Sequence, residues 1–232
     1  MASHLIQGQR VAMPVQVRRA GACSAMFTVP AGEARAIIDY SGMVPVEPVP
    51  GKALCSLAFV SYIDNDLGPY YEFAVAFLAR RRGSSMREIG VFIHWLPVDR
   101  SFTLEAGRRI WGFPKEMAEF ELDLDGPEKR CAVSIGGQLV VELGVAQGIR
   151  VPGGMPGSSV DAYTCIDGVL RRTPWNMRPS WVRSRPGGVR VRLGEHPIAE
   201  ELARLGLPKA AVFSSSIGQL AMTFGDAEEV AS

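Results

Sequence analysis

Alternating or short apolar runs dominate the chain, and this period of two is the pattern of β-strands with one buried face. The clearest case is the segment 119–125, where Phe120, Leu122 and Leu124 alternate with acidic residues. A strand of this kind packs one face on a core and exposes the other to water. The pattern therefore predicts a mainly β fold.

Helical signals are few, and Pro and Gly bracket the two helices that we predict, over 33–40 and 197–205. The predicted strands cover 54–62, 70–79, 89–96, 119–125, 131–135, 139–145, 189–193 and 216–224. Many antiparallel strands with a few short helices predict a closed or nearly closed β-barrel in an α+β protein. With 232 residues, 47% of them apolar, the chain can bury one substantial core, so we expect a single domain over 1–232.

The net charge and the search for membrane and signal segments limit the partners and the location that we expect for this protein. The net charge is +1, which gives no global attraction to nucleic acid or to a membrane surface. No run of apolar residues is long enough for a membrane span, and Met1 to Arg10 lacks an apolar signal core. We therefore expect a cytoplasmic protein. The four cysteines are far apart without a Cys-x-x-Cys pair, so we expect buried free thiols and no metal site.

A basic stretch without acids lies between Gly168 and Leu193, and it includes Trp175 and Trp181. Its arginines are Arg171, Arg172, Arg178, Arg183, Arg185, Arg190 and Arg192. No nucleic-acid-binding module surrounds this stretch, so a nucleic-acid partner is not expected. Arginine and tryptophan are enriched at subunit interfaces and around anionic substrates, so we expect a homo-oligomer or a substrate rim here.

Residues 107–118 contain one lysine, Lys115, whose neighbours Ile110, Trp111, Phe113 and Met117 are apolar. Only a neutral amine attacks a carbonyl, and burial in an apolar pocket disfavours the charged ammonium form. Lys115 is therefore a candidate Schiff-base nucleophile. A surface lysine after a turn is the structural alternative.

Proline is common at the first position of a helix, so Pro114 predicts a short helix from Pro114 to Ala118. Lys115 would then lie at the helix N-terminus, where the helix dipole modestly favours the neutral amine.

Gly107-Arg108 followed by Phe113-Pro114-Lys115 resembles the signature of the acetoacetate decarboxylase family. The resemblance extends to residues 67–72, which look like the family's strand with a pocket glutamate, and to 214–216 and 226–228, which look like its C-terminal strand pair. It implies a cone-like antiparallel barrel and a small oxo-acid substrate. It also implies no metal, flavin or pyridoxal cofactor, because the lysine itself supplies the electron sink.

The resemblance assigns roles to further residues. Glu72 would orient the substrate and relay protons, unless it is an ordinary outward-facing strand acid. Arg108 would pair with a substrate carboxylate, although a structural salt bridge is equally consistent. Trp111, Phe113 and Tyr71 would contact the substrate, and core packing is the alternative for the aromatic residues.

The chain departs from the decarboxylases at several positions. Their Schiff-base lysine is followed by a second lysine, and here Glu116 follows. Glu116 is a candidate acid/base group or a charge that modulates protonation of the neighbouring amine, unless it points away from the pocket. The family's second pocket glutamate has no match in 54–60, and Arg18 or Arg19 matches its arginine only after a shift.

Three functions remain open from the sequence. The first is a lyase that decarboxylates acetoacetate or a related small oxo acid through a Lys115 imine. The second is an aldolase-dehydratase that joins a pyruvate-like 2-oxo acid to an aldehyde through the same lysine, with Glu116 as an extra acid. The third is a non-catalytic barrel that binds a small ligand.

Overall fold

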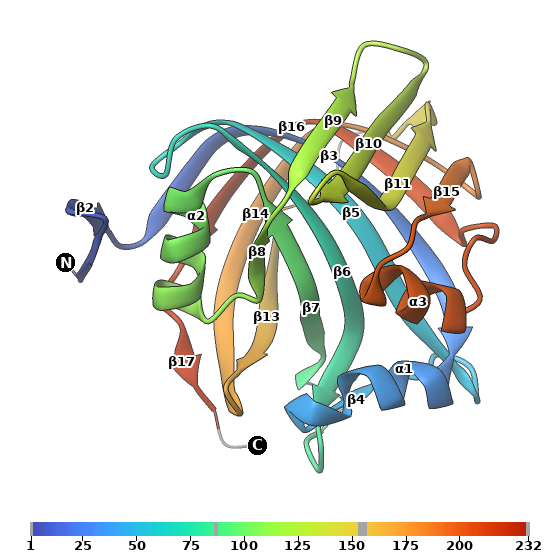
Figure 1. Cartoon of the computed structure of the whole chain (residues 1–232), viewed down its shortest axis with the longest axis horizontal. Coiled ribbons are helices and arrows are strands. Elements are labelled where there is room, and N and C mark those ends of the chain that lie inside the picture. The colour runs from blue at the N-terminus through green and yellow to red at the C-terminus, as the bar shows by residue number, and fades with distance from the viewer. Residues whose placement is uncertain (1, 86–87, 153–156, 231–232) are drawn as a thin grey trace.

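The computed structural model describes residues 2–85, 88–152 and 157–230, and its centre is a closed barrel of seven strands (Figure 1). The strand order is β6-β5-β3-β16-β14-β13-β7, and β7 pairs again with β6 to close the ring. These strands are β3 (Val15–Pro30), β5 (Lys52–Asn65), β6 (Tyr70–Arg81), β7 (Gly90–Val98), β13 (Ser158–Ile166), β14 (Val169–Arg185) and β16 (Phe213–Phe224). The mainly β barrel predicted from the sequence is confirmed.

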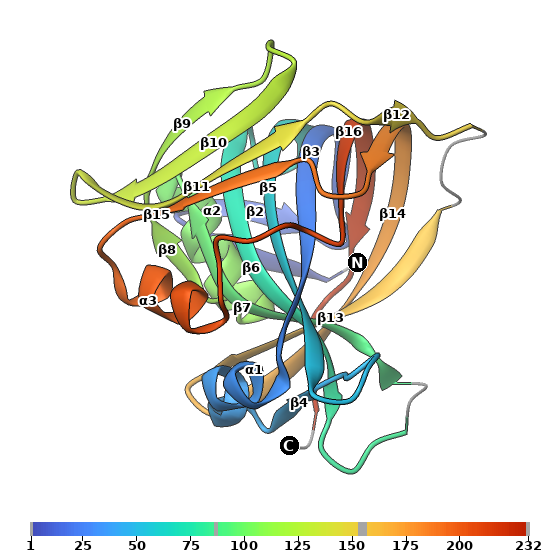
Figure 2. The same ribbon diagram turned by 90° about the vertical axis from the view of Figure 1, so that its right-hand side faces the viewer.

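A second sheet of four strands, in the order β15-β11-β10-β9, lies across one side of the barrel (Figure 2). Its strands are β9 (Glu119–Asp123), β10 (Glu128–Ile135), β11 (Gln138–Ala146) and β15 (Val189–Leu193). The short strands are β1 (Ser3–Ile6), β2 (Gln9–Ala12), β4 (Met43–Pro45), β8 (Lys115–Met117), β12 (Ile149–Arg150) and β17 (Glu228–Glu229).

Helices contribute little to the described chain. They are α1 (Ala31–Ile38) with a 3-10 turn (Asp39–Ser41), α2 (Ser101–Ala106) continuing into a π-helix (Gly107–Trp111), and α3 (Pro197–Arg204). The helices predicted at 33–40 and 197–205 correspond to α1 and α3. Within the described ranges, no helix has the length and apolar character needed to span a membrane.

The barrel is antiparallel except at one seam, where β7 and β13 run parallel with Val91 opposite Ala162. β8 also pairs with β7 in parallel. The sequence patterns missed β3, β13 and β14. In β3 the alternation is interrupted by adjacent arginines at 18–19, and β14 contains Pro174 and Pro179, which are unfavourable inside a strand.

Two clusters of buried apolar side chains hold the fold together. The first lies between the barrel and the four-stranded sheet, and Phe27, Leu57 and Val141 belong to it. The second joins α2 and the π-helix to the other face of the barrel strands, and Ile110 and Leu220 belong to it. Burial of apolar surface in both clusters is the main favourable term for the fold. The candidate site belongs to the second cluster.

The basic stretch forms β14 and β15, and acids from other strands pair with many of its arginines. The ion pairs are Arg171–Glu229, Arg172–Glu228, Arg190–Glu128 and Arg192–Glu142. The absence of acids within the stretch therefore does not leave it as a uniform positive surface.

Candidate active site

Lys115 is the first residue of β8, and only 2% of its surface is exposed. β8 pairs with β7 with Leu96 opposite Lys115, and the Leu96 N–H donates to the Pro114 carbonyl at 3.3 Å. The predicted helix from Pro114 to Ala118 is therefore wrong, because this segment hydrogen-bonds to β7 rather than to itself. The expected effect of a helix dipole on the amine does not apply.

The helical turns lie just upstream, in α2 and the π-helix, and they shape the path of the lysine side chain. Gly112 ends the π-helix with φ +64, a conformation that favours glycine. Gly107 packs directly on the lysine: a Cβ there would lie 2.5 Å from Cδ and 2.6 Å from Cε of Lys115. The glycine of the Gly107-Arg108 pair thus leaves the space through which the Lys115 side chain reaches its pocket.

Glu72, on β6, is the partner of the lysine. Its Oε2 lies 2.8 Å from Nζ of Lys115, and its other oxygen, Oε1, accepts a hydrogen bond of 2.9 Å from the Tyr62 hydroxyl. Glu72 is 7% exposed, so the pair is almost completely removed from water. The strand register explains the geometry, because Tyr62 lies opposite Tyr70, two residues before Glu72 and on the same face.

Tyr62 and Tyr70 are stacked, with ring centroids 4.1 Å apart, and Nζ of Lys115 lies 5.0 Å from the Tyr70 centroid. Burial, together with the nearby Glu72 carboxylate, raises the pKa of both phenols well above the ordinary value. Both tyrosines therefore keep their protons at neutral pH, and Tyr62 donates to the carboxylate.

Aromatic side chains from distant parts of the chain complete the pocket. Trp111 stacks on Phe113 with centroids 5.4 Å apart, and Trp175 meets Phe113 and Phe224 edge to face. Leu67 also lines it. The remaining cavity is about 10 Å³, which is room for about one water molecule. Substrate entry therefore requires the lining side chains to move.

One polar atom at this pocket lacks a partner: the buried indole Nε1 of Trp175 makes no hydrogen bond within the described chain. An unsatisfied buried donor is costly, so such an atom at a pocket is a candidate contact for a ligand oxygen. Among the described residues that line the pocket, Lys115 is the one cation and Glu72 the one carboxylate.

Three of the residues expected to act at the site lie outside the pocket lining. Arg108 is exposed, and its Nε donates to the backbone carbonyl of Lys115 at 2.8 Å. Tyr71 is 36% exposed and packs near Phe120. The Glu116 carboxylate accepts a hydrogen bond of 2.7 Å from Trp95 Nε1, in the first core cluster.

Arg18, which was considered as a match for the family's pocket arginine, is exposed and pairs with Asp64 and Asp66. Arg19 is exposed as well.

Sequence reasoning missed Tyr62, Tyr70, Trp175 and Phe224. The two tyrosines flank a turn that contains Gly68, so antiparallel pairing across that turn could have placed them opposite each other. Trp175 and Phe224 carry no local signal, because only the barrel closure brings β14 and β16 to this pocket.

Comparison with known proteins assigns the family. The family model described as acetoacetate decarboxylase matches residues 7–231, nearly the whole chain. The chain belongs to the acetoacetate decarboxylase family. The resemblance noted in the sequence is thereby confirmed. A search of curated proteins finds no match to the chain.

Solved structures with the acetoacetate decarboxylase fold are similar over most of their length. Acetoacetate decarboxylase from Legionella pneumophila subsp. pneumophila str. Philadelphia 1 has a TM-score of 0.73 and 17% identity, covering 95% of this chain and 88% of that one. The enduracididine biosynthesis enzyme MppR, in complex with pyruvate, has a TM-score of 0.71 and 14% identity, covering 95% and 91%.

An acetoacetate decarboxylase-like enzyme from Sphingomonas wittichii RW1 has a TM-score of 0.64 and 14% identity, covering 99% of both chains. At these identities the likeness shows the shared fold. Together with the family match, these enzymes support an enzyme of the lyase type.

Proposed function

We propose that this protein decarboxylates acetoacetate or a closely related small 3-oxo acid through an imine on Lys115. The observation that carries the proposal is the buried contact of 2.8 Å between Nζ of Lys115 and Glu72, inside a pocket of aromatic side chains. A lysine and a single proton acceptor, both removed from water, are the groups that imine formation requires.

The reaction begins with the loss of a proton from Nζ of Lys115, because only a neutral amine attacks a ketone. Two buried charges are costly to desolvate, and moving the proton from Nζ to Glu72 converts the ion pair into a neutral amine and a carboxylic acid. The amine then attacks the ketone carbon of the substrate. Glu72 donates its proton to the carbinolamine hydroxyl, which leaves as water, and Tyr62 holds the carboxyl group in place throughout.

The resulting iminium draws electrons from the bond to the carboxylate. That bond breaks, carbon dioxide leaves, and its bonding electron pair forms an enamine. Protonation of the enamine carbon gives a new iminium, which water hydrolyses to the product ketone and free Lys115. This sequence of steps requires the ketone carbon to be bonded directly to the carbon that carries the carboxylate. The reaction therefore acts on 3-oxo acids.

The pocket walls support carboxylate loss. No arginine is among the described residues that line the pocket, so a bound substrate carboxylate has no cation there besides the nitrogen of Lys115. Carbon dioxide is neutral, and a site that binds the carboxylate weakly but holds the rest of the substrate favours the transition state over the ground state. The unpartnered Trp175 indole N–H offers one neutral donor to orient the carboxylate.

The aldolase-dehydratase reaction is the second candidate, and the likeness to MppR in complex with pyruvate favours it. That reaction must hold a 2-oxo acid and an aldehyde together, so the lining side chains, which leave about 10 Å³ here, would have to move further than for one small 3-oxo acid. It also needs further proton transfers, and Glu116, which could have assisted, bonds to Trp95 instead. We therefore rank it below decarboxylation.

Reductive trapping tests the proposal. The protein is incubated with acetoacetate and borohydride, and adducts are located by peptide mass spectrometry. We expect an isopropyl increment on Lys115, because decarboxylation precedes reduction, together with carbon dioxide release that Lys115→Ala abolishes. Lys209→Ala is the matched control, since burial also lowers the pKa of Lys209 but it lies outside the pocket.

Mass increments other than isopropyl on Lys115 distinguish the alternative functions. An adduct that retains its carboxyl group, or one formed only with pyruvate, would favour the aldolase type. No adduct with any of a panel of 2- and 3-oxo acids would support the non-catalytic barrel and refute the enzyme.

A further inference from the structure

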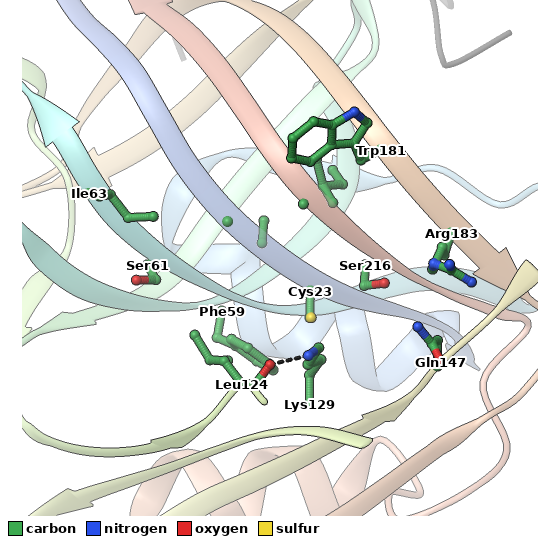
Figure 3. Close-up of a pocket in the computed structure, with 14 residues that line it drawn as sticks. Cys23, Phe59, Ser61, Ile63, Leu124, Lys129, Gln147, Trp181, Arg183 and Ser216 are labelled. Atoms are coloured by element: carbon green, nitrogen blue, oxygen red, sulfur yellow. Dashed lines mark hydrogen bonds between the residues drawn. The ribbon is translucent and has the colours of Figure 1, made fainter. Parts of the chain in front are cut away.

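A larger hollow, which we call the Trp181 cavity, is lined by residues that include Cys23, Phe59, Lys129, Trp181 and Arg183 (Figure 3). It lies on the opposite face of β5 from the active site. Its volume is about 370 Å³, within the size range of small-molecule sites. The two sites are separated by β5: Tyr62 faces the Lys115 pocket, whereas its neighbours Ser61 and Ile63 line the Trp181 cavity.

The cavity exists because the first core cluster ends in small and polar side chains. On β3 the buried row that includes Ala25 and Cys23 ends at Gly21, which leaves the floor open. On the facing strand β10, the row that contains Cys131 continues to Lys129. The ammonium of Lys129 therefore replaces the apolar side chain that would otherwise fill this end of the core.

Among the described residues, the cations around the cavity have no acidic partner. Lys129 donates to the Leu124 carbonyl, and Arg183 donates to the Gly148 carbonyl at 3.3 Å. No aspartate or glutamate is among the described lining residues, and neither cation forms an ion pair within the described ranges. Burial raises the pKa of the Cys23 thiol to about 12, so the floor stays neutral and does not balance these charges.

A second, independent observation also indicates an anion. In the register of β12 and β14, Arg150 lies directly opposite Arg183, and both line a hollow of about 250 Å³ next to the cavity. Like charges directly opposite each other destabilise a strand pair. An anion between the two guanidinium groups would remove this repulsion, and guanidinium binds a carboxylate with two parallel hydrogen bonds.

Trp181 forms the apolar wall. It is 65% exposed and has φ +55, a left-handed conformation that is unfavourable for a bulky residue. Strain of this kind persists where the surroundings impose it, and it gathers at ligand sites. On the neighbouring strand the residue beside it is Gly218, where a Cβ would lie 3.2 Å from the Trp181 Cβ. The indole is thus held as a flat surface beside the two arginines.

We propose that the Trp181 cavity is a second ligand site, which binds an aromatic carboxylate. Its ring lies between Trp181 and the apolar side chains of Phe59 and Ile63, and its carboxylate lies at Arg183, between that guanidinium group and the one of Arg150. The site is independent of the imine chemistry proposed for Lys115.

Isothermal calorimetry with naphthoate tests this site on the intact protein. We expect saturable binding of one naphthoate per chain, and Arg183→Gln weakens it about tenfold, as loss of one charged hydrogen-bonding group predicts. Trp181→Ala weakens binding, whereas Trp181→Phe preserves most of it. The matched control is Arg178→Gln, an exposed arginine on the same strand that lies outside the lining. Circular dichroism verifies that each variant is folded.

The remaining outcomes overturn the proposal. Equal binding of the neutral isostere naphthamide would show that the cavity binds the aromatic ring but does not recognise the carboxylate. Binding that is lost in Lys115→Ala but retained in Arg183→Gln would place the ligand in the active site. Competition by inorganic phosphate at equal concentration would indicate a general anion site. Failure of naphthoate to bind refutes the ligand site, and if Trp181→Ala also dissociates an oligomer in sedimentation, a second copy of the chain covers this face.

Discussion

At the residue scale, one carboxylate is placed at the amine and another is kept away from it. Glu72 and Glu116 both lie near Lys115 in the structure, but Glu72 comes from β6, on the far side of β7 from β8, and contacts Nζ. Glu116 follows Lys115 on β8, and successive side chains on a strand point to opposite faces. A strand at this position, rather than the predicted helix, therefore separates the two acids.

Glu116→Gln tests this separation. Glutamine can still accept the hydrogen bond from Trp95 Nε1, so the fold is preserved while the charge is removed. We expect the pH dependence of acetoacetate turnover to be unchanged within experimental error. A shift of the acid limb to lower pH would mean that the Glu116 charge reaches the amine. Glu72→Gln provides the contrast, because it removes the proton acceptor at Nζ and should abolish turnover.

At the element scale, the π-helix delivers Lys115 to its pocket. The segment 107–111 turns the chain, Phe113 N–H bonds back to the Gly107 carbonyl at 3.0 Å, and β8 begins two residues later. Trp111 is anchored from the far end of the chain, since its indole Nε1 donates to the Gly225 carbonyl at 2.7 Å. The π-helix before Lys115 and the pairing of β8 with β7 therefore fix the backbone on both sides of the lysine.

Gly107→Ala should disturb the lysine more than the helix. Alanine is the better helix former, but the added methyl group would overlap Cδ and Cε of Lys115. We expect loss of most of the borohydride-trapped adduct while the far-ultraviolet circular dichroism spectrum is kept. Gly32→Ala in α1 is the matched control, because a Cβ there meets nothing within 4 Å. If Gly107→Ala traps as much adduct as Gly32→Ala, the glycine does not define the path of the side chain.

The same elements show what the sequence could predict. Short, largely apolar runs in 54–62, 70–79 and 139–145 located β5, β6 and β11, because strands packed in the core carry mostly apolar side chains. The Pro114 signal for a helix failed because tertiary pairing with β7 outweighs a local preference. Trp175 could not be placed, since its position in the pocket depends on barrel closure between strands far apart in the sequence.

At the scale of the whole molecule, buried cysteine thiols make the stability of the fold depend on pH. Burial raises the pKa of Cys23 and of Cys55 from 9.0 to about 12, and Cys55 is fully buried in the first core cluster. In the unfolded chain these thiols ionise near their ordinary pKa. Between pH 9 and 12 the native state therefore binds more protons than the unfolded state, and stability falls as the pH rises.

Each of these thiols should lower the free energy of unfolding by about 1.4 kcal/mol per pH unit in that window, with no effect well below pH 9. Urea unfolding with reductant, measured from pH 7 upward, gives the slope. Cys55→Ala should make the fall of unfolding free energy with pH shallower by the contribution of one thiol, about 1.4 kcal/mol per pH unit. Leu57→Ala is the control, because it also opens a core cavity but removes no ionisable group, so it lowers stability equally at every pH. Equal slopes for the two variants would show that Cys55 ionises in the folded state as readily as in the unfolded one.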